Sequence, residues 1–217
     1  MNTYEYILKK YNINVGRQHI IEIPNMARNH LAELFVELEF NLGAEIGVAL
    51  GHYSEILCKA NPKLHLYSID PWKITAYEPG IVPAEAGNLD SQELFDSQYK
   101  SAQKRLAPYN CTIMRKSSMS ALKDFADNSL DFVYIDANHD FVNFTNDLHY
   151  WKKKVRVGGI VSGHDYKNFP QRKHNHVKWV VDAYFRCYRM IPYFIVGAVG
   201  EKGVTRDHAP SWFWVKT

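Results

Sequence analysis

The chain has 217 residues, a length that suits one domain able to bury a full core without disulfides. Its 26 basic and 23 acidic residues give a formal net charge of +3, which is too small to indicate nucleic-acid binding by bulk electrostatics. The three cysteines form no CxxC or metal-ligand pattern, so we expect reduced thiols. The first residues lack the profile of a signal peptide, and no apolar run approaches the ~20 residues that span a bilayer. We therefore expect a cytoplasmic protein that does not contact membranes.

Helical and strand-like patterns alternate from about residue 26 onward, which is typical of a mostly parallel sheet with helices on both faces. Residues 1–25 are interpreted as a partly helical N-terminal extension and residues 26–217 as a single domain. In chain order the patterns predict helix 26–40, strand 44–47, helix 54–60, strand 64–69, helix 91–106, strand 112–115, helix 118–125, strand 130–135, helix 141–154, a turn at 157–159, strand 160–163, helix 177–186, and two antiparallel strands at 191–199 and 212–216. The expected fold is a three-layer α/β sandwich whose mostly parallel, seven-stranded sheet includes an antiparallel C-terminal strand. The proline- and glycine-bearing stretch 71–88 is expected to be a long loop of the kind that often covers a site.

A strand-to-helix turn carries the first candidate binding residues, in the run Glu45-Ile46-Gly47-Val48-Ala49-Leu50-Gly51. Gly47 lets the backbone approach a ligand closely, and Gly51 allows a tight turn into a helix whose first N–H groups are free. Asp70 closes the next strand, where a carboxylate can accept hydrogen bonds from both hydroxyls of a ribose. Because the glycine spacing is not GxGxxG, we expect a ligand that has a ribose and an adenine but no pyrophosphate.

This E-x-G-x-x-x-G run, followed by Asp70, resembles the cofactor signature of class I S-adenosylmethionine-dependent methyltransferases. The segments Val133–Phe141 and Val155–Tyr166 are similar to a subfamily with an IDxxHxY … GGxxxGHDY pattern, distantly related to metal-dependent O-methyltransferases of natural-product biosynthesis. The resemblance covers roughly residues 30–186. It implies a Rossmann-like fold, S-adenosylmethionine as cofactor, and methyl transfer to an oxygen of a small-molecule acceptor of the sugar or natural-product type.

The resemblance also implies a role for each matching residue. The cofactor would be held by Glu45, Gly47 and Gly51 at its methionine and ribose end, by Asp70 at the ribose, by Ser118 near the adenine and by Asp136 near the sulfonium. The sequence departs from the pattern at Phe141, which stands where a tyrosine is expected, so no role of that hydroxyl is carried over.

Two acidic residues, Asp136 and Asp165, and two histidines follow strands that we expect to be neighbours, at the edge where open α/β sheets bind ligands. One hypothesis is that Asp136, His164 and Asp165 hold Mg²⁺ or another divalent cation, which would orient and acidify an acceptor hydroxyl. His139 is then the candidate general base, with Asp136 beside it in the catalytic centre. The alternative is structural: Asp136 caps the helix that begins near Phe141 or binds cofactor, and His164 pairs with Asp165. The sequence leaves both interpretations open.

Other functions are less well supported by the residues. A nucleic-acid methyltransferase is disfavoured because the chain has no Asn-Pro-Pro-Tyr-like element and no catalytic Pro-Cys pair. The basic tract 167–178 is either a clamp for an anionic substrate or a solvated loop, and the small net charge favours the loop. A nucleotide-sugar enzyme or dehydrogenase is disfavoured because GxGxxG and DxD motifs are missing. The aromatic strand Ser211–Val215 either completes the sheet or meets a second copy in a homo-oligomer.

Overall fold

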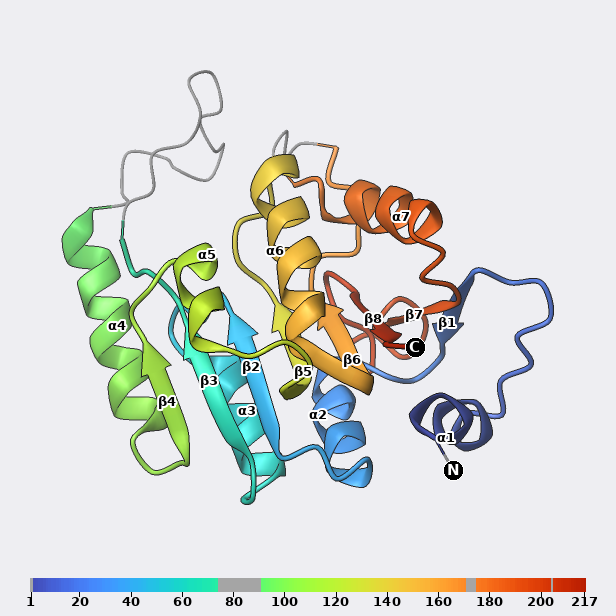
Figure 1. The fold of residues 1–217 in the computed structure, drawn as a ribbon, viewed down its shortest axis with the longest axis horizontal. Helices are drawn as coiled ribbons and strands as arrows, with labels where there is room; N and C mark the ends of the chain where they lie inside the picture. Colours follow the sequence, from blue (N-terminus) through green and yellow to red (C-terminus); the bar gives the residue numbers. More distant parts are fainter. Residues whose placement is uncertain (1, 74–90, 171–174, 204) are drawn as a thin grey trace.

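The computed structural model describes residues 2–73, 91–170, 175–203 and 205–217 (Figure 1). Within these ranges one sheet of eight strands runs in the order β1-β7-β8-β6-β5-β2-β3-β4. The strands are β1 (Ile20–Ile23), β2 (Leu42–Ile46), β3 (His65–Ile69), β4 (Cys111–Met114), β5 (Leu130–Ile135), β6 (Val155–Gly163), β7 (Tyr193–Val196) and β8 (Ser211–Val215). Neighbouring strands are parallel except at β8, which runs antiparallel to both β6 and β7. The predicted α/β class and the antiparallel C-terminal strand are confirmed.

The sheet differs from the prediction in two places. The sheet has an eighth strand in addition to the expected seven. This strand, β1, pairs in parallel with β7 at the edge of the sheet. This strand has only four residues and alternates half-buried, buried, exposed and buried side chains, so its sequence pattern is weak. The predicted turn at 157–159 is wrong, because these residues lie inside β6. Gly158 adopts φ +76° there, and the pairing with β5 shifts register between Leu130 and Phe132, so the glycines bend one strand instead of ending it.

Helices cover both faces of the sheet, as predicted. They are α1 (Thr3–Lys10), α2 (Arg28–Glu37), α3 (His52–Ala60), α4 (Gln92–Leu106), α5 (Ser118–Ala121), a 3-10 turn (Leu122–Asp124), α6 (Phe141–Lys154) and α7 (Val177–Cys187). In Figure 1, α5, α6 and α7 lie in front of the sheet, while α2 and α3 lie behind it. One apolar cluster joins the sheet to α6 and α7, and a second joins its other face to α1, α2 and α3. In the part of the chain that is described, no helix is long and apolar enough to cross a membrane.

The register of the parallel strands places four strand ends level with one another. Ile46 at the end of β2 pairs with Ile69 of β3 on one side and with Ile135 of β5 on the other. Ile135 in turn pairs with Gly163 at the end of β6. The residues that directly follow these ends therefore meet at one edge of the sheet, where ligands bind in such folds. Residues 74–88 of the predicted long loop and residues 171–174 of the basic tract fall outside the described residues.

Candidate active site

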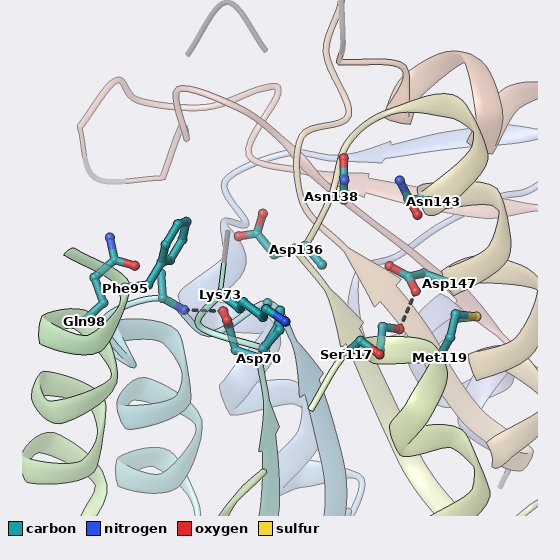
Figure 2. Close-up of a pocket in the computed structure, with 15 residues that line it drawn as sticks. Asp70, Lys73, Phe95, Gln98, Ser117, Met119, Asp136, Asn138, Asn143 and Asp147 are labelled. Carbon is teal, nitrogen blue, oxygen red and sulfur yellow. Dashed lines mark hydrogen bonds between the residues drawn. The ribbon is translucent and has the colours of Figure 1, made fainter. Parts of the chain in front are cut away.

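A pocket of about 520 Å³ opens at this edge (Figure 2), within the size range of small-molecule sites. The residues that line it are Gly47, Ala49, Asp70, Pro71, Lys73, Phe95, Gln98, Ser117, Ser118, Met119, Asp136, Ala137, Asn138, Asn143 and Asp147. Four of the six predicted cofactor residues are among them: Gly47, Asp70, Ser118 and Asp136. Figure 2 shows Asp136 above the strand ends, between Asp70 on one side and Asp147 on the other.

The two glycines of the predicted turn both adopt left-handed backbone conformations. Gly47 has φ +89°, and a Cβ built there would lie 2.1 Å from the carbonyl oxygen of Asp136. Glycine is therefore required at this position, because the backbone of Asp136 leaves no room for a side chain. Gly51 has φ +77° and forms the N-cap of α3. It does not line the pocket, so its observed place is at the entry to the helix.

Asp70 holds together the two loops that border the pocket. Its Oδ2 accepts hydrogen bonds from the backbone N–H groups of Val48 (2.9 Å) and Ala49 (3.0 Å), and its Oδ1 accepts one from Trp72 (2.7 Å). Ala49 and Trp72 have positive φ values of 48° and 40°, so this carboxylate is bonded to strained backbone on both sides. A carboxylate has about four acceptor positions, so Asp70 retains capacity for a ligand hydroxyl.

Glu45 lies away from the pocket. Only 2% of it is exposed, and its carboxyl accepts a hydrogen bond from Ser54 of α3. The Ser54 hydroxyl also lies 2.7 Å from that of Ser68, which completes a small polar group beneath the helix. Burial raises the pKa of Glu45 to about 8. The expectation that Glu45 lines the cofactor site thus differs from its placement, because alternate residues of β2 face opposite sides of the sheet and Glu45 faces α3.

The raised pKa of Glu45 predicts that the free energy of unfolding depends on pH. Its pKa in the unfolded chain is about 4.3, so the neutral form is favoured in the folded state, and this contribution is lost as the pH rises toward 8. Glu45→Gln, which cannot ionise, is expected to gain stability relative to the original protein between pH 5 and pH 8, by up to ~4 kcal/mol. Urea unfolding at the two pH values measures this, with the exposed Glu33→Gln as control. An equal difference at both pH values would contradict a buried, neutral Glu45.

The second candidate group gathers at the ends of β5 and β6. The imidazole of His139 lies between two carboxylates, with Nδ1 3.3 Å from Asp165 Oδ2 and Nε2 3.4 Å from Asp136 Oδ1. His164 Nδ1 lies 3.2 Å from Asp165 Oδ1 and 3.7 Å from Asp136 Oδ2. Asn175 donates a hydrogen bond of 2.7 Å to Asp165 Oδ2. The four predicted residues of this group are therefore adjacent. The backbone of Asp165 adopts φ +60°, a strained conformation that is common at functional sites.

This arrangement does not match a metal site. Among the described residues, no group of three or more His, Cys, Asp or Glu is arranged to hold a metal ion. The reason is visible in the contacts: the carboxylates of Asp136 and Asp165 are turned toward the two imidazoles, and the Arg28 guanidinium lies 3.9 Å from Asp136 Oδ2. The prediction that Asp136, His164 and Asp165 form a cation site is therefore not supported.

The N-cap of α6 shows whether Asp136 caps this helix, which the sequence left open. The side chain that caps this helix is Asp140, whose Oδ1 accepts hydrogen bonds from the N–H groups of Val142 and Asn143 at 3.0 Å each. Asp136 is therefore not the helix cap. Its carboxylate stays at the pocket wall beside His139 and Arg28.

The structure also places at the site residues that were not predicted from the sequence. Arg28, the first residue of α2, is half-buried, and its guanidinium lies over the ring of Tyr53 at 5.3 Å while facing Asp136. Asp147 projects from α6 into the pocket and accepts a hydrogen bond from Ser118. A signal for Asp147 was present: it occupies the apolar face of its helix, between Phe144 and Leu148.

Comparison with known proteins identifies the family. A family model described as a methyltransferase domain matches residues 44–166, which is more than half of the chain and includes the ends of β2, β3, β5 and β6. The chain belongs to this methyltransferase family. The resemblance to class I S-adenosylmethionine-dependent methyltransferases is thereby confirmed. No curated protein sequence matches the methyltransferase significantly.

Solved structures share the fold of this methyltransferase at low sequence identity. The O-methyltransferase TomG from Streptomyces achromogenes, involved in tomaymycin synthesis and solved with SAM, is 19% identical over 88% of this chain and 80% of its own, with a TM-score of 0.57. The O-methyltransferase from Bacillus cereus, solved with SAH, is 16% identical over 99% and 90% of the two chains, with a TM-score of 0.58. Spermidine synthase from Thermotoga maritima is 11% identical over 88% and 60%, with a TM-score of 0.57. Because transferases of different groups share the fold, the fold alone does not identify the acceptor.

Proposed function

We propose that this methyltransferase transfers the methyl group of S-adenosylmethionine to an oxygen of a small hydroxylated molecule. The proposal rests on one observation: the pocket bordered by Asp70 and the charged group around His139 adjoin each other at one edge of the sheet. The pocket bordered by Asp70 continues to Asp136, His139 lies beside Asp136, and Asp165 lies on the other side of the His139 ring. The pocket suits a nucleoside, and the group around His139 suits removal of a proton.

The residues at the pocket fit the cofactor. Asp70 would accept hydrogen bonds from the ribose hydroxyls, and the turn at Gly47 would pass beside the methionine part. When bound, S-adenosylmethionine supplies an electrophilic methyl group and a neutral sulfur leaving group. The structural relatives TomG and the Bacillus cereus enzyme were solved with SAM and SAH respectively, which supports the same ligand here.

Removal of the proton from the acceptor hydroxyl is assigned to His139. Burial by itself would raise the pKa of Asp165, but the hydrogen bond from His164 and the charge of His139 lower it to about 2. Asp165 is therefore ionised at neutral pH and can orient the His139 ring and stabilise its protonated form. In this proposal His139 removes the proton from the acceptor hydroxyl, while Arg28 and Asp136 form the adjoining charged wall.

The first acceptors to test are sugars and hydroxylated natural-product types, as the sequence resemblance implies. The hypothesis of a divalent cation is tested separately, because the carboxylates that would hold the ion already face His139, His164 and Arg28. No step in the proposed mechanism is assigned to a metal ion.

The experiment is a calorimetric titration followed by an activity screen. Purified protein is titrated with S-adenosylmethionine, S-adenosylhomocysteine and NAD⁺, and we expect micromolar binding of the two adenosyl compounds and none of NAD⁺. Formation of S-adenosylhomocysteine is then measured with phenols, catechols and sugars, with EDTA and with added Mg²⁺ or Mn²⁺. Turnover that persists in EDTA supports His139 as the base. Folded protein that binds neither adenosyl compound would refute the proposal.

A further inference from the structure

One acidic residue of the pocket has no role in the chemistry described above. Asp147 lies on α6, in the middle of an apolar face formed by Phe144, Leu148 and Trp151. It is 4% exposed and yet lines the pocket. A carboxyl group placed on the buried face of a helix is costly unless its oxygens find donors, so its partners indicate what it does.

Among the described residues, hydrogen-bond donors reach one of the two carboxylate oxygens of Asp147. The indole Nε1 of Trp151 donates a hydrogen bond of 2.7 Å to the Ser118 hydroxyl, and that hydroxyl donates its own hydrogen to Asp147 Oδ1. Because a serine hydroxyl has a single hydrogen, Ser118 has none left to donate to a ligand. Within the described residues Asp147 Oδ2 has no hydrogen-bond partner, so this oxygen is left to accept a hydrogen bond inside the pocket.

The place of Asp147 tells which part of a ligand it meets. Figure 2 shows Asp147 and Asn143 on the side of α6, across the pocket from Phe95 and Gln98 of α4, with Asp70 at the base. A nucleoside whose ribose is held at Asp70 must place its base within the remaining space of the same pocket. Ser117, Ser118, Met119 and Asp147 all border that space, and Ser118 donates a hydrogen bond to Asp147.

We infer that Asp147, positioned by the Ser118 hydroxyl, accepts a hydrogen bond from the 6-amino group of adenine and thereby selects a 6-amino purine over a 6-oxo purine. This inference rests on the proposed function, because it requires an adenosyl cofactor in the pocket. A 6-oxo purine would bring a carbonyl acceptor against a carboxylate acceptor, which leaves buried polar atoms unpaired. Burial raises the pKa of Asp147 to about 7, so a measurement at pH 8.5 examines the carboxylate form.

The test compares two ligands that differ only at this position of the base. Dissociation constants of S-adenosylhomocysteine and of its deaminated analogue, S-inosylhomocysteine, are measured by calorimetry at pH 8.5. The original protein is expected to prefer the 6-amino ligand by at least tenfold. In Asp147→Asn, whose amide can donate to a 6-oxo group, the preference is expected to fall below threefold. Asp182→Asn on α7, outside the pocket, is the matched control and is expected to keep the full preference.

A second variant guards against a merely structural effect. Ser118→Ala keeps the carboxyl group but removes the hydroxyl that positions it, and we expect the preference to fall by three- to tenfold. A folded Asp147→Asn protein, verified by thermal unfolding, that keeps the original preference would overturn the inference. Equal binding of both ligands by the original protein would also overturn it while leaving the proposed function intact. Binding of neither ligand would contradict the proposed function and this inference together.

Discussion

Asp70→Ala is expected to weaken binding of S-adenosylhomocysteine by at least tenfold, which corresponds to about 1.4 kcal/mol. The physical reason is twofold. The variant removes an acceptor for the ribose hydroxyls, and it also releases the backbone N–H groups of Val48, Ala49 and Trp72, which border the pocket. We also expect a loss of stability of roughly 2 kcal/mol, because hydrogen bonds to a charged acceptor are among the stronger ones. Calorimetric titration and urea unfolding measure the two effects.

The two roles of Asp70 can be separated with a modified ligand. The 2′-deoxy analogue of S-adenosylhomocysteine is expected to bind the original protein at least fivefold more weakly than the parent compound, and this penalty should disappear in Asp70→Ala. A merely structural role would lower the affinity for both ligands and keep their ratio. The control is Asp127→Ala, an exposed carboxylate that pairs with Lys154 away from the pocket. If Asp70→Ala binds each of the two ligands with the same affinity as Asp127→Ala does, Asp70 is not the ribose-binding residue.

His139→Ala is expected to lower kcat by about 10²- to 10⁴-fold with whichever hydroxyl acceptor the screen identifies, because removal of a general base typically has an effect of this size. Binding of S-adenosylhomocysteine is expected to stay within threefold, since His139 does not line the nucleoside pocket. Asp165→Asn is expected to show a smaller fall in kcat, since the ring would lose the carboxylate beside Nδ1. Initial rates of S-adenosylhomocysteine formation, measured with saturating acceptor, provide the comparison.

The control for this prediction is His65→Ala, at the opposite end of the sheet. His65 begins β3 and shares a hydrogen bond of 2.9 Å with Thr112, so its loss is expected to leave kcat within twofold. The pH profile adds a readout that a structural role would not move. With His139 as base, the rise of kcat with pH should be lost in His139→Ala. An unchanged profile and a kcat within threefold of the original protein would exclude His139 as the base.

The order of elements could be predicted because helix and strand periodicities are local properties of a sequence. The strands that end before Gly47, Asp70 and Asp136 have long apolar or alternating patterns and were predicted within one or two residues. β1 was missed because four residues carry little periodicity and its partner, β7, lies near the other end of the chain. The break predicted at 157–159 failed because a glycine pair has the same local signal in a turn and in a bulged strand.

The sequence by itself determined the α/β class, the methyltransferase family and the positions of the strand ends, because each follows from patterns within a few tens of residues. Tertiary structure decided what each side chain does there. It turned Glu45 toward Ser54 instead of the pocket, and it made Asp140 the cap of α6. It also joined Ser118 to Asp147, a contact between separate helices. Such choices depend on which face of an element meets which neighbour, and only long-range packing decides that.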